Sequence, residues 1–150
     1  MEKDLAAGFP FASCLVNGIL RCSADANHQA RGIHEITNLG VAMGGKRETF
    51  SGLSGVGDLI VTCCSMHSRN RRAGILIGKG TDPQEAVRQV GTVEGYYCCH
   101  AAWKLAQKLG VSMPITEQLY HILFEQGSAK DAIQALMGRP VKREDDFLQA

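Results

Sequence analysis

Helix start and stop signals recur along most of this chain, and they leave little room for β-strands. Serine, aspartate or proline opens several segments, and glycine follows the last apolar residue of most of them. The segments predicted to be helical are 12–22, 25–43, 59–64, 68–77, a short stretch from 83, 94–109, 115–125 and 128–137. Only residues 59–64 have the β-branched composition of a strand, and the lack of a second strand candidate favours a short buried helix there. The sequence therefore predicts an all-α fold.

Composition and charge restrict the classes of function. The 150 residues are enough for one domain with a real core, and a hydrophobic share of 45% with a charged share of 21% is typical of a globular protein. A net charge of +1 argues against a general nucleic-acid or membrane binder, which would carry a broad basic excess. No apolar run has the length of a membrane span and the first residues lack a signal-peptide pattern, so we expect a cytoplasmic protein.

The spacing of cysteine and histidine argues against a metal site. The six cysteines, at 14, 22, 63, 64, 98 and 99, include no C-x-x-C pair, and the five histidines show no ligand spacing. Neighbouring cysteines cannot easily bridge each other. We therefore expect the cysteines to be small buried hydrophobic residues in a reducing compartment.

The strongest candidate for a binding site is the run Ser68-Arg69-Asn70-Arg71-Arg72. Ser68 is placed to cap a helix, and the N–H groups at the positive helix end attract an anion. Arg69 and Arg72 share one helical face, where guanidinium groups can grip a phosphate, and Asn70 can donate its amide to a phosphate oxygen. Arginines in a first turn oppose the helix dipole, which favours a bound anion over a plain charged turn. The run predicts a site for a small phosphate.

Two acidic residues beside glycines are further candidates, and each has a structural alternative. Asp58 follows a glycine-rich stretch, where the backbone can approach a ligand and a carboxylate can accept bonds from substrate hydroxyls. Glu94 precedes Gly95 and can reach ribose hydroxyls in a similar way. Aspartate is equally common as a helix N-cap and glutamate in a first helical turn, and on residue type alone these structural interpretations are preferred.

A series of motifs, in this order and spacing, resembles one known family. The motifs are Arg31-Gly32, Glu35-Ile36-Thr37, Leu39-Gly40, Gly44-Gly45, Gly52 to Leu59, Thr62-Cys63, Ser68 to Arg72, Val93-Glu94-Gly95, Met113 to Glu117 and Leu136 to Arg139. Over residues 31–142 the chain resembles the C-terminal domain of the bacterial type of NAD(P)-dependent sn-glycerol-3-phosphate dehydrogenase. The resemblance implies an all-helical bundle like the C-terminal half of 6-phosphogluconate dehydrogenase.

The resemblance also implies a reaction and a substrate site. The family passes a hydride between a nicotinamide cofactor and C2 of glycerol 3-phosphate or dihydroxyacetone phosphate, in the synthesis of phospholipid precursors. By the matching motifs, Asp58 would contact the hydroxyl side of the substrate. Ser68, Arg69 and Asn70 would hold its phosphate end.

For the cofactor, NAD or NADP, the resemblance implies contacts from Arg69, Thr92, Val93 and Glu94. The choice between NAD and NADP would lie in the family's N-terminal dinucleotide-binding domain, which binds most of the cofactor. This chain has no G-x-G-x-x-G followed by a βαβ pattern. Without the dinucleotide-binding domain, we expect the helical domain to expose the apolar face that would contact it. A homodimer could form through this face.

The chain departs from the family pattern near its N-terminus. The family's catalytic lysine stands in a Lys-Asn-Val motif, and residues 1–24 contain no such motif, so no catalytic residue is assigned. We divide the chain into a poorly matching, helical segment at 1–24, the family's domain at 25–142 and a charged tail at 143–150. Without the nucleotide-binding domain and the lysine, we expect the isolated chain to be inactive.

Two other classes of function remain open from the sequence. One is a non-catalytic module that binds phosphate esters or a partner and is derived from the same fold. The other is nucleic-acid binding by the arginine cluster, which is weak because the patch is short and lacks interleaved aromatic residues.

Overall fold

The computed structural model describes residues 26–51, 65 and 67–138, and this part of the chain forms seven helices and no strand. The helices are α2 (Ala26–Ala42), α3 (Arg47–Ser51), α5 (Arg69–Gly78), α6 (Pro83–Val90), α7 (Glu94–Leu109), α8 (Pro114–Phe124) and α9 (Ala129–Met137). The all-α prediction is confirmed. The helices predicted at 12–22 and 59–64 lie outside the described residues, as do the segments 1–24 and 143–150.

Local signals account for most helix ends. Ser68, Asp82 and Ser128 are N-caps whose side chains accept hydrogen bonds from the first turns of α5, α6 and α9. Gly110 ends α7 in the left-handed conformation, with φ of 67°, which glycine adopts without strain. The sequence did not predict α3, because five residues are too few to show a helical period.

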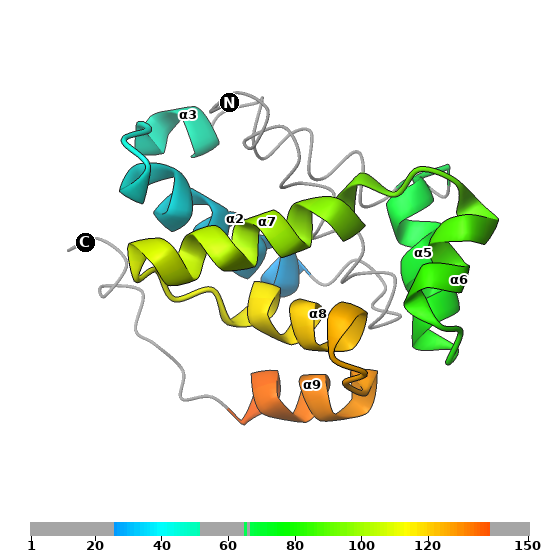
Figure 1. Ribbon diagram of the computed structural model, residues 1–150. Coiled ribbons are helices and arrows are strands. Elements are labelled where there is room, and N and C mark those ends of the chain that lie inside the picture. Colours follow the sequence, from blue (N-terminus) through cyan, green and yellow to red (C-terminus); the bar gives the residue numbers. More distant parts are fainter. Residues whose placement is uncertain (1–25, 52–64, 66, 139–150) are drawn as a thin grey trace.

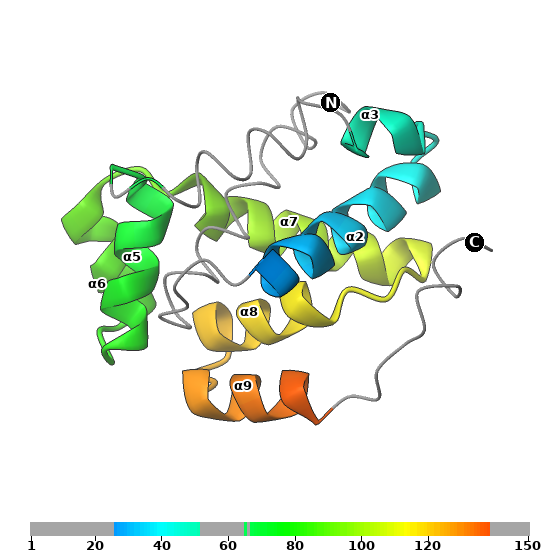
Figure 2. The same ribbon diagram turned by 180° about the vertical axis from the view of Figure 1, so that it is seen from behind.

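Helix α7 lies at the centre of the bundle (Figures 1 and 2). It packs against α8, α2 and α5, and α9 covers the far side of α8. The pair α5–α6 lies at the N-terminal end of α7, whereas α3 lies against α2 at the opposite end. The arginine-bearing start of α5 is therefore placed beside the start of the central helix.

Small residues on α7 allow this central position. Gly95, Cys99, Ala102 and Ala106 are buried at a spacing of three and four residues, which forms one stripe along the helix. Ala102 and Ala106 join Leu39 and Met113 in one core cluster, while Cys99 belongs to a second one. The second cluster consists of Ala73, Ile77, Ala86, Val93, Cys99, Leu119, Ile122, Leu123 and Ala132. Each large aliphatic side chain buried there stabilises the fold by about 1.5–3 kcal/mol.

Helix α8 is capped from another helix. Its own N-cap is Met113, which makes no side-chain capping bond. The buried carboxylate of Glu35, on α2, accepts hydrogen bonds from the backbone N–H groups of Ile115 (2.6 Å) and Thr116 (3.1 Å) and from the Thr116 hydroxyl (3.1 Å). A carboxylate at a helix N-terminus is favoured by the helix dipole as well as by these bonds. Glu35 thus fixes where α8 begins relative to α2.

Close packing at a glycine fixes α3. The ring of Phe50 lies so near Gly40 on α2 that an added Cβ would stand 2.1 Å from its Cζ atom. Only a residue without a side chain leaves room for the ring. Gly40 lies near the end of the helix predicted over 25–43, and α2 continues through it to Ala42.

Candidate functional site

The N-terminal turn of α5 carries the residues predicted to bind an anion. Ser68 is the N-cap, in an extended conformation, and its Oγ accepts a hydrogen bond from the Arg71 N–H at 3.3 Å. The helix begins at Arg69 and has no acidic residue in its first turn. Nothing in that turn therefore neutralises the positive end of the helix dipole or the arginines on it.

The arginines of this turn differ in exposure. Arg69 and Arg72 are exposed, and Arg71 is half-buried. Within the described ranges, neither Arg69 nor Arg72 forms an ion pair. Their guanidinium groups can therefore approach an anion without first breaking a contact to a carboxylate in this part of the chain.

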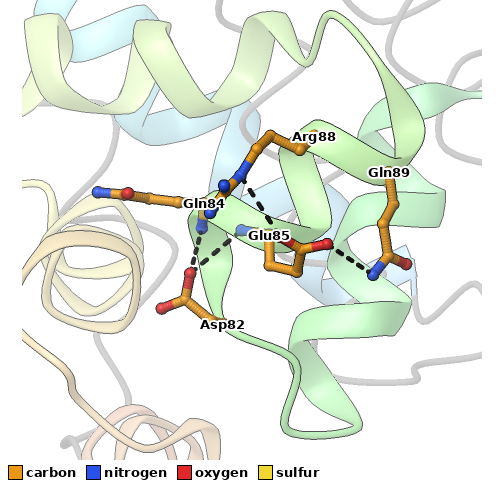
Figure 3. A network of polar contacts seen from close by, with 5 residues as sticks. All are labelled: Asp82, Gln84, Glu85, Arg88 and Gln89. Carbon is orange, nitrogen blue, oxygen red and sulfur yellow. Dashed lines mark hydrogen bonds and ion pairs between the residues drawn. The ribbon is translucent and has the colours of Figure 1, made fainter.

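The neighbouring arginine on α6 is different. Figure 3 shows Arg88 paired with Glu85, at 3.4 Å from Nε to Oε2. Glu85 also accepts a hydrogen bond from Gln89, and Asp82 accepts bonds from the backbone N–H groups at the start of α6. Because Arg88 is already paired with Glu85, α6 is not a second candidate anion site. Arg88 instead serves as a control arginine.

Asn70 joins the starts of two helices. It is only 4% exposed, and its Oδ1 accepts a hydrogen bond from the backbone N–H of Gly95 at 2.8 Å. The two residues are 25 apart in the sequence, and Gly95 stands in the first turn of α7. The bond brings the N-terminal turns of α5 and α7 together, so that two positive helix ends lie near the arginines.

The residues assigned to the cofactor lie at the start of α7. Thr92 and Glu94 are exposed, whereas the side chain of Val93 is fully buried in the core. The whole residue, backbone included, is 0% exposed, so Val93 supports this turn from the core. The structure places this segment directly beside Asn70, because Glu94 precedes the glycine that Asn70 binds. We call Ser68–Arg72 together with Thr92–Gly95 the α5–α7 junction.

The remaining predicted site residue cannot be placed in the junction. Asp58 lies outside the described residues. Among the residues that the structure describes, no group of histidine, cysteine or acidic side chains could hold a metal ion, and no helix could cross a membrane. Sequence reasoning missed Gly95 as the partner of Asn70. The signal was the apolar residue at the N-cap of α7, which leaves that helix without a cap of its own.

The cysteines near the junction are not activated. Burial raises the pKa of the Cys98 thiol to about 11, and the nearby Glu94 carboxylate raises it further. Burial raises the pKa of Cys99 more strongly, and Cys98 adds to the effect. A raised pKa keeps both thiols protonated near neutral pH, so neither is suited to act as a nucleophile. Both are free, as predicted for small buried residues, although Cys98 is only half-buried.

The described residues form an all-helical domain in which two helix N-termini meet at a junction with exposed arginines. Residues 9–134 match the family described as NAD-dependent glycerol-3-phosphate dehydrogenase C-terminus. The chain belongs to this family. The matched range begins upstream of residue 25, within the segment that the motifs left unassigned.

Similar proteins agree with this assignment. The chain is 56% identical over 116 residues to a glycerol-3-phosphate dehydrogenase [NAD(P)+] from Clostridium perfringens, covering 77% of this chain and 35% of that protein. It is 55% identical over 115 residues to the protein of the same name from Fusobacterium nucleatum, covering 76% and 34%. The chain thus spans about a third of the length of the curated relatives it matches.

Two solved structures share the fold. The crystal structure of glycerol-3-phosphate dehydrogenase from Coxiella burnetii superposes with a TM-score of 0.85 at 35% identity, over 92% of this chain and 44% of that one. The glycerol-3-phosphate dehydrogenase of Saccharomyces cerevisiae superposes with a TM-score of 0.71 over 88% of this chain and 40% of that one. Its identity of 23% makes it evidence for the fold alone.

Proposed function

We propose that this chain is the substrate-binding part of an NAD(P)-dependent glycerol-3-phosphate dehydrogenase and that the α5–α7 junction holds the phosphate of the substrate. The observation that carries the proposal is the Asn70–Gly95 hydrogen bond, which sets two helix N-termini beside two exposed arginines. The names of the relatives support the substrate, which is glycerol 3-phosphate or dihydroxyacetone phosphate.

The junction would bind the phosphate by three kinds of donor. The backbone N–H groups at the start of α5 and the Asn70 amide supply short directional bonds. Arg69 supplies charge and paired bonds, and its exposed position lets it also face the cofactor. Asp58 would accept bonds from the hydroxyl side of the substrate. These contacts position the three-carbon chain, so that C2 is presented for hydride transfer.

The residues at the start of α7 fit a peripheral contact to NAD or NADP. Thr92 and Glu94 are exposed, and the fully buried Val93 holds the turn between them against the core. When bound, the cofactor supplies the hydride exchange with C2 of the substrate. This chain contributes orientation at one edge of the cofactor, and the dinucleotide-binding domain of the full enzyme would bind the rest.

Calorimetric titration with glycerol 3-phosphate tests the binding site. We expect the wild-type chain to bind and Arg69→Ala to bind at least about tenfold more weakly, because a charge-assisted bond contributes about 1.5–3 kcal/mol. Arg88→Ala removes an arginine that is engaged with Glu85, and it should bind like the wild type. Equal affinities for wild type and Arg69→Ala would count against the assigned site.

Activity tests the second part of the proposal. We expect no cofactor-dependent turnover from the chain alone, and turnover when the dinucleotide-binding domain of a relative is supplied together with that relative's Lys-Asn-Val segment. A non-catalytic phosphate-ester module, the alternative function, would bind the substrate yet stay inactive after that addition. Ordinary turnover by the chain alone would contradict the assignment of this chain to substrate binding only.

A further inference from the structure

The two ends of the Asn70 amide are in different situations. Oδ1 is engaged by the Gly95 N–H, and the side chain is almost fully buried. Nδ2, by contrast, makes no hydrogen bond within the part of the chain that the structure describes. A buried amide that uses only its acceptor is uncommon, because an unpaired buried donor costs about 1–3 kcal/mol. The geometry leaves that donor for a ligand.

Helix α7 depends on this amide. Its N-cap is Val93, whose side chain is buried in the core and makes no capping bond. One of the first N–H groups of the helix, that of Gly95, is instead capped by Asn70 from α5. The cap therefore holds the Thr92–Glu94 segment against the start of α5.

We infer that Asn70, besides binding the anion, couples the two halves of the junction. Its Oδ1 fixes the start of α7, and this bond sets the amide orientation that presents Nδ2 to the anion. An anion bound at the start of α5 would thereby order the Thr92–Glu94 segment. The substrate phosphate and the turn that faces the cofactor would then be held in a fixed relative position. The identity of the anion in this inference rests on the function proposed above.

Two substitutions separate the two ends of the amide. Asn70→Asp keeps an acceptor of the same shape for the Gly95 N–H, and a carboxylate in the first turn of α5 is favoured by the helix dipole. It replaces the free donor by a second acceptor, which repels a phosphate. Asn70→Ala removes both ends. The matched control is Gln84→Glu, which adds the same charge at the exposed second residue of α6.

Hydrogen exchange at the Gly95 amide, followed by NMR with and without glycerol 3-phosphate, is the test. We expect exchange to be about tenfold faster in Asn70→Ala than in the wild type, and unchanged in Asn70→Asp. Added glycerol 3-phosphate should slow Gly95 exchange further in the wild type and in Gln84→Glu. In Asn70→Asp it should have no effect, and calorimetry should show binding weakened at least about tenfold.

The outcomes distinguish this inference from the proposed function. Equal exchange rates of the Gly95 amide in wild type and Asn70→Ala would show that Asn70 does not cap α7, and would overturn the inference. Binding of glycerol 3-phosphate by the wild type without any change at Gly95 would overturn the coupling and leave the proposed function standing. Unweakened binding by Asn70→Asp would show that Nδ2 does not face the anion. No binding by the wild type would overturn both proposals.

Discussion

Removal of the Glu35 carboxylate should destabilise the whole bundle, because this side chain caps α8 from α2. It is 5% exposed and accepts hydrogen bonds from Ile115, Thr116 and the Thr116 hydroxyl. Glu35→Ala leaves two backbone N–H groups without their acceptor in a buried site. Each such loss costs about 1–3 kcal/mol, and at about 1.5 kcal/mol each the free energy of unfolding should fall by about 3 kcal/mol.

Glu35→Gln removes the negative charge of the side chain but keeps its volume. Glutamine keeps the shape but has one acceptor, and its amide group turns a donor toward donors at the start of α8. We expect a loss of about 2 kcal/mol, from one missing bond and the lost interaction of the charge with the helix dipole.

Urea and thermal unfolding, followed by circular dichroism, measure both variants. In a chain of this size a loss of 3 kcal/mol lowers Tm by roughly 9 °C, at about 2–4 °C per kcal/mol. Glu48→Gln is the matched control, since Glu48 is an exposed first-turn residue of α3. If Glu35→Gln and Glu48→Gln have the same free energy of unfolding within about 0.5 kcal/mol, the capping argument is wrong.

Two further predictions concern the packing of α2 and the thiols of α7. Gly40→Ala should lower the free energy of unfolding by about 1–3 kcal/mol, because its Cβ would overlap the Phe50 ring. In a double-mutant cycle, Phe50→Ala should suppress this loss. Additive losses from the two substitutions would refute the contact. Because the folded pKa of Cys98 is raised from 9.0 to about 11, its contribution to stability is complete below pH 9 and is lost as the pH rises toward 11. Alkylation of Cys98 by iodoacetamide should accordingly keep rising above pH 9, and a plateau by pH 9 would contradict the raised pKa, while Cys99 should react more slowly still.

Much of the fold was predictable because its signals are local. The caps Ser68, Asp82 and Ser128 and the left-handed Gly110 mark helix ends within a few residues of sequence, and the bounds 94–109 agree with the structure. A cap and its first turn are neighbours in the chain, so residue type alone carries the information. Ser68 is both such a cap and a member of the predicted anion site.

The rest depends on contacts between distant segments. Glu35 lies 80 residues from Ile115, and Asn70 lies 25 from Gly95, and no local pattern pairs them. Residue type alone predicted a phosphate ligand at Asn70 but not its role as a cap. Val93 was assigned to the cofactor from a motif, and only the packing shows that its side chain belongs to the core.

Amide chemical-shift mapping of the 150-residue chain with glycerol 3-phosphate tests the central claim most directly. If the α5–α7 junction holds the phosphate, the largest shifts should fall on residues 68–70 and 92–95, and they should saturate together with one affinity. Arg69→Ala should abolish both groups of shifts at the same ligand concentration. Shifts centred on another surface, with residues 68–70 and 92–95 unmoved at saturation, would contradict the account.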